Sequence, residues 1–500
     1  MKVLFATSHF GFLRNFEAGL RALAERGHQI HLLADRRENM GGSTTVDLLT
    51  AAYPNITVGW GPPRKDWLWQ PLTVNLRLCL DYWRYLQPRY ANAHALRERA
   101  ATQVPAEAVR LTQIPVIGSR PMLAVYRAMI RRVERAAPIA PGVTELLEQE
   151  RPDIVVVTPL LYFGSQQVDY VRAAKRLGIP TLLAVGSWDH LTTKGLIHEV
   201  PDRLTVWNEA QRAEAGELHG IASDRVTVTG SPAYDHWFVA TPSMPRDEFC
   251  AHVGLPMDRP IVLYLCSSPF ITPHEVGFVR RWMIAVRASQ SRTLATAAIL
   301  VRPHPQNADQ WRDVSLADLG PASIWPSAGA NPVDAESRAT YFNSMYYSAA
   351  VAGVNTSALI ESGIVGRPVF SVQADEFAGT QEGTLHFQHL KNVNGGLLTM
   401  SGSLAEHEQQ LAAFLDAPPP AEPPGRKFVE AFIRPHGLDQ PAGPRLADAI
   451  EDIVRTVKPL PQRRRRSDAV WATLLRPVAT AAYAAARQRR LARKEARAGQ

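Results

Sequence analysis

The stretch VNTSALIESG at residues 354–363 is the most informative segment of the chain. An apolar run ends at Val354, a polar turn follows, and a helical pattern begins near Leu359. A strand that passes through a short turn into a helix is the repeating unit of a parallel α/β sheet. The segment therefore predicts an α/β fold, with the turn at the carboxyl edge of the sheet, where ligands bind.

The same turn is a candidate phosphate site. A helix that opens after a parallel strand presents unpaired N–H groups and the positive end of its dipole. We expect Asn355, Thr356 and Ser357 to offer these groups to a diphosphate. We expect Glu361, about one turn further on, to accept hydrogen bonds from ribose hydroxyls. A capping box, in which Glu361 only caps its own helix, is the alternative that the spacing leaves open.

Two further polar turns are predicted at the same edge. The RPHP motif ends an apolar strand, so that Arg302 can fork onto phosphate oxygens with His304 beside it. Ser267 and Ser268 end another apolar strand and can line the same cleft. A surface loop is the alternative for the first motif, and a plain strand-to-loop turn is the alternative for the second.

Strand and helix patterns alternate along most of the chain on either side of these motifs. The first set of strands is expected at 2–7, 29–34, 153–158, 181–186, 204–207 and 226–229. The second set is expected at 261–266, 298–302, 349–354 and 369–372, with helices near 274–290, 336–346 and 356–365. Two such sets predict two Rossmann-like domains, each a doubly wound parallel sheet.

The predicted hinge between the domains is a turn-forming run that closes the first set: Gly230, Ser231 and Pro232. The expected parts of the chain are an N-terminal domain at 1–235, a C-terminal domain at 236–457 and a basic tail at 458–500. A helical insertion is expected at about 61–142, with helices near 72–86, 89–100 and 121–136. Its Trp and Arg side chains either face a membrane surface or an acceptor, or pack on the first domain.

The composition is that of a globular protein with a large core, since 46% of the 500 residues are hydrophobic and 20% are charged. Cys79, Cys250 and Cys266 are far apart, which excludes a CxxC metal motif or a disulfide framework and fits a reducing compartment. The N-terminus lacks the long apolar region of a secretory signal, and no apolar run has the length of a spanning helix. We therefore expect a cytoplasmic protein.

The net charge of +8 belongs to the tail. Residues 458–500 hold 12 Lys/Arg and 2 Asp/Glu, a net of +10, so that residues 1–457 carry a net of −2. After a possible N-cap at Ser467, apolar residues recur at helical spacing: Trp471, Leu474, Leu475 and Val478. A basic amphipathic helix of this kind predicts binding to an anionic membrane surface through residues 463–497.

A solvated, partly disordered extension is the alternative for the tail, because most runs of charge are solvated. Nucleic acid is the other polyanion to consider, but the tail lacks the interleaved aromatic residues on which bases stack. No nucleic-acid partner is therefore expected.

The order of the motifs resembles that of two-Rossmann (GT-B type) glycosyltransferases. The RPHP turn, the strand–NTS–helix unit and the GRPV run at 366–369 resemble their donor half, and VTVTGSPAYD at 226–235 resembles their hinge. The resemblance covers roughly residues 150–400. It is closest to bacterial surface-polysaccharide transferases and CDP-glycerol glycerophosphotransferases.

This resemblance implies that the second domain holds a nucleotide-diphosphate donor and that the first holds an acceptor. Glu361 would take the ribose of the donor. Its phosphates would be contacted by Arg302, Thr356 and Ser357, with His304 as a further candidate. In one departure from the family, Gly353 stands where the retaining pattern has a second glutamate. An inverting reaction is therefore favoured, and such a reaction needs a general base at the acceptor hydroxyl.

Two segments of the first domain are candidates for that base. His9 follows the first strand, and Asp189 follows a later one, next to His190 as a candidate orienting partner. A structural role is the alternative for each residue. His386 and His389 have the spacing of two metal ligands, but no third ligand lies near them in the sequence. We expect no metal and no cofactor, since an arginine and a helix dipole can act in place of a divalent ion.

These inferences predict a transferase that moves a sugar or a polyol-phosphate from a nucleotide-activated donor to a cell-envelope glycan or lipid-linked acceptor. The tail would hold this enzyme peripherally on the inner face of the membrane. A nonhydrolysing nucleotide-sugar epimerase shares the architecture and would turn over the donor without an acceptor. A non-catalytic nucleotide-sugar-binding or membrane scaffold would bind the donor without turnover.

Overall fold

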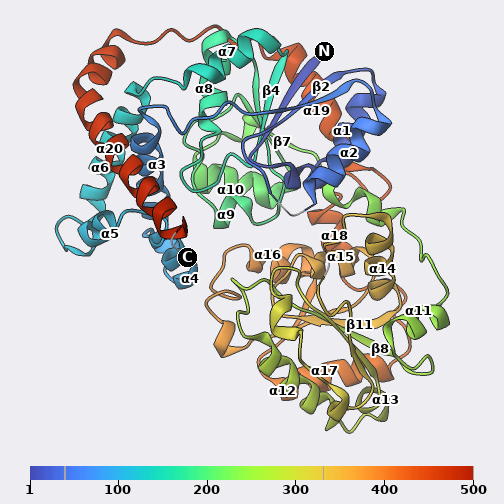
Figure 1. Ribbon diagram of the computed structural model, residues 1–500. Coiled ribbons are helices and arrows are strands. Elements are labelled where there is room, and N and C mark those ends of the chain that lie inside the picture. Colours follow the sequence, from blue (N-terminus) through green and yellow to red (C-terminus); the bar gives the residue numbers. More distant parts are fainter. Residues whose placement is uncertain (39–40, 330, 499–500) are drawn as a thin grey trace. The chain divides into compact units, whose positions relative to one another are not determined.

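The computed structural model describes residues 1–38, 41–329 and 331–498. The chain forms two compact α/β units (Figure 1). The first unit consists of residues 1–206, 211–227 and the chain from Pro444 onward, and the second consists of residues 207–210 and 228–443. The return of the chain to the first unit near Pro444 has no counterpart among the boundaries expected from the sequence.

Seven strands form the sheet of the first unit, in the order β3-β2-β1-β4-β5-β6-β7. They are β1 (Lys2–Thr7), β2 (Gln29–Ala34), β3 (Ile56–Trp60), β4 (Ile154–Thr158), β5 (Thr181–Ala184), β6 (Arg203–Val206) and β7 (Val226–Val228). β1 pairs in parallel with β2 on one side and with β4 on the other. The order is that of a doubly wound sheet with its topological switch point between β1 and β4.

Helices cover both faces of this sheet (Figure 1). α1 (Glu17–Glu25), α2 (Gly42–Ala52) and α19 (Ala442–Thr456) share a core on one face, and α8 (Val168–Leu177) packs against β4 and β5. α19 buries four residues at helical spacing in this core: Leu446, Ala447, Ile450 and Ile453. α19 therefore completes the core of the first unit, although the boundaries expected from the sequence assign it to the C-terminal domain at 236–457.

Six strands form the sheet of the second unit, in the order β10-β9-β8-β11-β12-β13. They are β8 (Ile261–Leu265), β9 (Ala298–Arg302), β10 (Ala322–Ile324), β11 (Ser348–Gly353), β12 (Val369–Val372) and β13 (Leu398–Ser401). β8 pairs in parallel with β9 and with β11, which places the switch point between β8 and β11. The prediction of two Rossmann-like doubly wound domains is confirmed.

The helices of the second unit also lie on two faces (Figure 1). α12 (Glu275–Arg287), α13 (Arg292–Ala295) and α17 (Leu404–Asp416) share an apolar core with the sheet. α14 (Ala335–Tyr346) and α15 (Ala358–Ile364) lie on the other face, which also carries Arg302. Strand alternation explains this placement, because Val301 points into the core and the next residue must point away from it.

The insertion of the first unit lies between β3 and β4. Its helices are α3 (Gln70–Arg84), α4 (His94–Ala101), α5 (Ala106–Gln113), α6 (Arg120–Ala136) and α7 (Pro141–Glu150). Helices α3, α4 and α6 correspond to the three expected helices, whereas α5 and α7 have no expected counterpart. Trp69 and Trp83 are buried, so these two aromatic residues pack inside the first unit.

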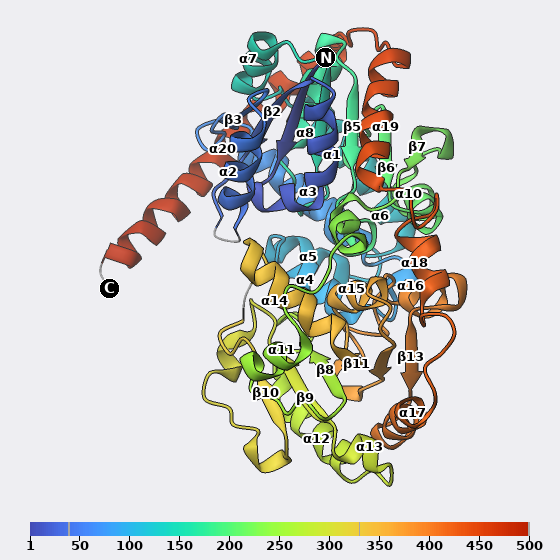
Figure 2. The ribbon, with the colours of Figure 1, turned by 90° about the vertical axis from the view of Figure 1, so that its right-hand side faces the viewer.

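The tail forms one long helix, α20 (Arg466–Ala498), which lies beside α3 and α6 (Figure 1). Ala472 and Ala479 are buried against Trp69 and Ala137, and Leu475 packs at the edge of the same cluster. The tail is therefore a docked helix over its first turns. Figure 2 shows its last turns extending away from the sheet of its unit.

A stripe of buried charge on α3 supports the loops that follow β4 and β5. Arg77, Asp81 and Arg84 recur at helical spacing, and each is at most 1% exposed. The Asp81 carboxylate accepts hydrogen bonds from the backbone N–H groups of Gly164 (2.8 Å) and Leu196 (2.7 Å). Both acceptor oxygens of one buried carboxylate thus bind loop backbone.

The two arginines of this stripe bind the same loops. Arg84 Nη1 donates to the carbonyl oxygens of Lys194 (3.0 Å) and Gly195 (2.8 Å). Arg77 Nη1 donates to the Ser165 carbonyl (2.6 Å), while its Nε donates to the carboxylate of Glu134 on α6 (2.5 Å). Helix α3 therefore connects both loops and α6 through charge-assisted hydrogen bonds.

One buried histidine in the second unit lacks any polar partner. His407, on α17, is 1% exposed and lies between the rings of Trp282 and Phe370. Neither of its ring nitrogens has a hydrogen-bond partner. Burial lowers the pKa of His407 to about 4, because a charged imidazolium would lose its hydration there.

We expect His407→Leu to raise the thermal unfolding midpoint at neutral pH, because a buried polar group without a partner costs about 1–3 kcal/mol. Below pH 6.5 the unfolded chain protonates His407 and the folded chain does not. The folded protein therefore has its full stability with respect to His407 above pH 6.5, and this stability falls as the pH drops toward 4. The variant should lose less stability between pH 7 and pH 5 than the wild type, and the exposed control His252→Leu should behave as the wild type. A lower midpoint with an unchanged pH dependence would contradict this account.

We expect Asp81→Ala to destabilise the first unit by about 3–5 kcal/mol, because the buried N–H groups that donate to the Asp81 carboxylate lose their acceptor. Amide hydrogen exchange should speed up at Gly164 and Leu196, which donate to this carboxylate. The matched control is Asp153→Ala, because Asp153 accepts from the Lys2 N–H at an exposed position (2.7 Å). Unchanged exchange at both loop amides in Asp81→Ala would refute the role assigned to α3.

Candidate active site

The expected donor residues meet at the switch point of the second sheet. Leu265 at the end of β8 pairs with Arg302 on one side and with Gly353 on the other. The Asn355 N–H donates to Ser267 Oγ (3.3 Å), so the turns after β8 and β11 touch. The strand order thus brings together turns that are nearly 90 residues apart in the sequence.

Arg302 and Glu361 join one cluster through Tyr341 of α14. The Arg302 guanidinium lies 4.6 Å from the centre of the Tyr341 ring, and its Nη1 donates to Ser344 Oγ (3.0 Å). The Tyr341 hydroxyl donates to the Glu361 carboxylate. The sequence did not single out Tyr341, because a tyrosine on an ordinary helix carries no motif.

The electrostatics of this cluster favour an anion. Burial lowers the pKa of Arg302 to about 10, although Tyr341 and Glu361 both oppose the shift. Burial therefore costs the charged guanidinium more hydration free energy than its interactions with Tyr341 and Glu361 restore. A phosphate placed against it would supply the missing negative charge through forked hydrogen bonds. Arg302 is only 6% exposed, so the site is largely preformed.

The helix after β11 is shorter than expected. α15 begins at Ala358 with Ser357 as its N-cap and contains seven residues, so few peptide dipoles add up along it. Ile360 occupies the third helical position, which a capping box reserves for Glu or Gln, so Glu361 is not part of such a box. The positive charge of the site therefore comes mainly from Arg302.

His304 and Ser268 lie in the turns beside this cluster. His304 Nδ1 accepts from the Gln306 N–H (3.1 Å), and the Ser268 carbonyl accepts from the N–H groups of Ile271 and Thr272. Both residues are partly exposed at the edge of the sheet. These bonds shape the two turns from within.

Two buried residues that sequence reasoning missed hold these turns in place. Glu275 is fully buried, and its carboxylate accepts from the Ser267 N–H (3.0 Å). Burial raises the pKa of Glu275 to about 8. Gln381 Nε2 donates to the carbonyls of Val354 and Val372 (both 3.1 Å), which ties the ends of β11 and β12 together. Neither residue stands in a recognisable pattern.

His9 lies at the switch point of the first sheet, directly after β1. Its ring is 3% exposed and packs against Phe12, with Nε2 at 3.5 Å from the Tyr162 hydroxyl of the loop after β4. Its Nδ1 has no hydrogen-bond partner. Burial, followed by the cation of Arg36, lowers the pKa of His9 to about 4, so the ring is neutral at physiological pH.

Asp189 follows β5 on the same sheet. Its two carboxylate oxygens accept from Ser187 Oγ (2.5 Å) and Thr193 Oγ1 (2.8 Å), and Lys194 Nζ lies 3.7 Å away. The neighbouring His190 is buried, and burial lowers its pKa to about 4. The Asp189 carboxylate is thus oriented by hydroxyl groups of its own loop. Arg84 of α3 holds the same loop through its backbone carbonyls.

The expected hinge residues lie where the chain enters the second unit. Gly230 adopts a positive φ of 80°, which suits glycine, and the Ser231 N–H donates to the carbonyl of Ile433 (3.0 Å). Beyond Pro232, the buried Asp235 accepts from Arg434 Nη2 (3.1 Å) and from the Ala442 N–H (2.9 Å). The outgoing chain and the returning chain are therefore hydrogen-bonded to each other.

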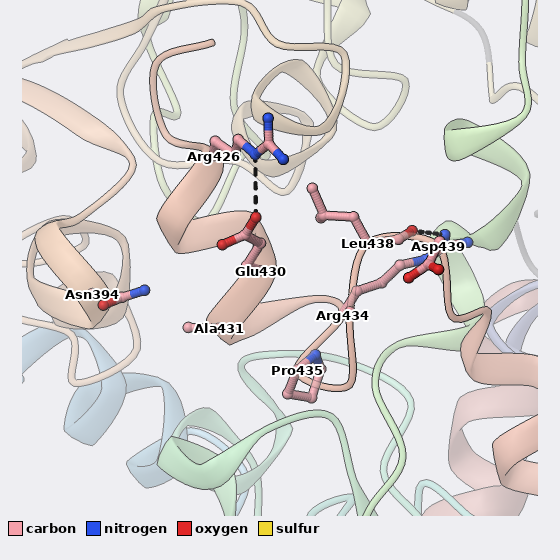
Figure 3. Close-up of a pocket in the computed structure, with 9 residues that line it drawn as sticks. Asn394, Arg426, Glu430, Ala431, Arg434, Pro435, Leu438 and Asp439 are labelled. Carbon is pink, nitrogen blue, oxygen red and sulfur yellow. Dashed lines mark hydrogen bonds and ion pairs between the residues drawn. The ribbon is translucent and has the colours of Figure 1, made fainter. Parts of the chain in front are cut away.

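A separate hollow of about 560 Å³ lies at α18 (Arg426–Phe432) and the segment after it (Figure 3). Figure 3 shows Arg426 paired with Glu430 and Arg434 bonded to the backbone of Leu438. The Arg426 Nε to Glu430 Oε1 distance is 3.2 Å. Because Arg434 also pairs with Asp235, both arginines at this hollow have a carboxylate partner. They therefore differ from Arg302, whose buried charge is only partly compensated.

The described part of the chain holds neither a cluster of metal-ligating side chains nor a membrane-spanning helix. No three or more His, Cys, Asp or Glu side chains gather there in a way that could hold a metal ion. His386 precedes α16 (Phe387–Asn392), and the ring of His389 packs against Phe432. Across the same residues, no helix has both the length and the apolarity needed to span a bilayer.

No protein-family model matches the chain, and no curated protein matches it either. Among solved structures, it is similar to a UDP-GlcNAc 2-epimerase from Methanocaldococcus jannaschii, with a TM-score of 0.51 and 12% identity over 90% of this chain and 100% of that one. It is also similar to a glycosyltransferase from Rickettsia africae ESF-5, with a TM-score of 0.50 and 11% identity over 91% of this chain and 98% of that one. At such identities the likeness concerns the fold alone. Together with its two doubly wound sheets, it shows that the chain has the GT-B fold of two Rossmann-like domains.

Proposed function

We propose that the protein is a transferase that moves a sugar or a polyol-phosphate from a nucleotide-diphosphate donor to a cell-envelope glycan or lipid-linked acceptor. The observation that carries this proposal is the buried Arg302 beside Tyr341 and Glu361, at the edge where α/β sheets bind ligands. We place the reaction in the cytoplasm, at the inner face of the membrane.

The donor would bind on the second unit. Arg302 would fork onto the diphosphate, and Glu361, already oriented by Tyr341, would accept hydrogen bonds from the ribose. The remaining donor contacts would come from the turns at the same edge: Ser267, Ser268, His304, Asn355, Thr356 and Ser357. Arg302 would also stabilise the negative charge that develops on the phosphate of the leaving nucleotide, so the proposed reaction uses no divalent metal ion.

The acceptor would be activated by a residue of the first unit. In an inverting sugar transfer, the base takes the proton of the acceptor hydroxyl while the hydroxyl oxygen bonds to the anomeric carbon and the nucleoside diphosphate leaves from the opposite side. In a polyol-phosphate transfer, the same oxygen bonds to the phosphorus that carries the polyol, and a nucleoside monophosphate leaves. His9 is neutral at physiological pH and its Nδ1 is unpartnered, so it is in the form that accepts a proton. Asp189 is the second candidate, with a carboxylate held by two hydroxyl groups.

A nonhydrolysing nucleotide-sugar epimerase is the second candidate function, because one similar structure is a UDP-GlcNAc 2-epimerase. Such an enzyme would convert the donor without any acceptor. A non-catalytic scaffold would bind the donor equally in the wild type and in base variants, with no turnover in either. Donor turnover with and without acceptor distinguishes these three functions.

We expect a nucleoside diphosphate (UDP, CDP or GDP) to raise the thermal unfolding midpoint by mass action. Arg302→Lys keeps the charge but loses the fork, and should weaken nucleotide affinity by about tenfold to a hundredfold. Glu361→Gln should weaken nucleotide binding but leave the binding of inorganic pyrophosphate unchanged. The control is Arg312→Lys, whose side chain is 74% exposed. If no nucleotide raises the unfolding midpoint of the wild type, or if Arg302→Lys binds nucleotide as tightly as the wild type does, the donor site is wrongly assigned.

We expect His9→Ala or Asp189→Asn, whichever removes the base, to lower kcat by about a hundredfold or more while nucleotide affinity stays unchanged. Donor consumption and product formation are measured with an acceptor present. The variant that keeps wild-type kcat is excluded as the base, and both keeping it would refute the assignment of the base to these loops. A loss of nucleotide affinity in either variant would argue against the separate roles given to the two units.

A further inference from the structure

The tail helix α20 docks on α6 in a definite direction. Arg464 Nη2 donates to the carbonyl of Ala136 at the end of α6 (2.8 Å), and Arg132 lies 3.4 Å from Asp468. The later residue of α6, Ala136, meets the earlier residue of the tail, and the earlier residue, Arg132, meets the later one. The two helices are therefore antiparallel. Since both helices rise about 1.5 Å per residue, Met129 lies level with Trp471, and Val125 lies level with Leu475, one residue beyond Leu474.

Apolar side chains remain exposed on both helices at these levels. Met129 and Val125 of α6 are 58% and 52% exposed, and Leu474 of α20 is 65% exposed. Further exposed apolar residues lie on α20 and on the turn before α6: Val116, Val470, Trp471 and Val478. Leu475, which the sequence placed on the membrane-facing stripe, packs instead on the cluster at Trp69 that docks α20. An exposed apolar patch carried by two adjacent helices is typical of an interaction site.

The same pair of helices is strongly basic. α6 carries five arginines and one acidic residue, Glu134, which is buried and paired with Arg77. Residues 463–498 carry 11 Lys/Arg and only two acidic residues, and Arg463, Arg465 and Arg466 are exposed. Any partner of this surface must therefore tolerate or provide negative charge.

We propose that the paired faces of α6 and α20 form one docking surface for an anionic lipid bilayer. Exposed aliphatic residues and a tryptophan would enter the interfacial region, while the arginines around them would contact lipid phosphates. Nucleic acid would use the arginines and leave the aliphatic residues unexplained, and a second copy would bring two basic surfaces together. The proposal rests on the proposed function for its purpose, because a surface-bound enzyme can reach a lipid-linked acceptor.

The test uses the full chain in vesicle flotation without substrate, with vesicles of phosphatidylcholine alone or mixed with phosphatidylglycerol. The wild type should bind the anionic vesicles only. Trp471→Glu combined with Leu474→Glu should weaken vesicle binding by about tenfold or more, since two apolar groups no longer enter the lipid. Val125→Glu combined with Met129→Glu should do the same, because α6 is half of the surface.

The matched control is Val239→Glu combined with Met257→Glu, which adds the same charge at exposed apolar positions of the second unit. Equal vesicle binding by the control and by both test variants would overturn the proposal. So would duplex DNA binding tighter than vesicle binding, or a wild-type dimer in light scattering that only the test variants dissociate. Nucleotide thermal shifts measured on the same variants should match the wild type, so that a failed donor site and a failed membrane surface give separate results.

Discussion

In each unit the direction in which strands are added reverses once, between β1 and β4 in the first sheet and between β8 and β11 in the second. Because crossovers between parallel strands are right-handed, the connections before and after the reversal lie on opposite faces. The carboxyl ends of the two central strands are thereby left uncovered by helices. Polar residues collect at both places, namely His9 with Tyr162 in one unit and Ser267 with Asn355 in the other.

Buried arginines in the two units differ in how their charge is matched. Arg84 is surrounded by backbone carbonyls of the loop after β5, and Arg77 is paired with a carboxylate, so both act as internal supports. Arg302 lies over a neutral tyrosine ring and receives only partial compensation from Glu361. This incomplete compensation of a buried charge is the observation that supports the proposed phosphate contact of Arg302.

Much of the fold could be predicted from the sequence because the central strands are continuous apolar runs, as sheets buried on both faces require. The strands that were missed, β3, β10 and β13, are all at sheet edges. Only the first residue of β3 is buried, so its sequence carries no apolar run. The charged stripe of α3 has the spacing of a solvated helix face, and nothing local shows that loops after β4 and β5 bury it.

The sequence by itself determined the alternation of strands and helices and the polar turns at strand ends, because these depend on residues close together in the chain. Only the tertiary structure decided that Tyr341 joins Arg302 to Glu361, that α19 completes the first core, and that Leu475 docks the tail. These contacts join segments distant in sequence, and a helix pattern shows which residues share a face but not what covers that face.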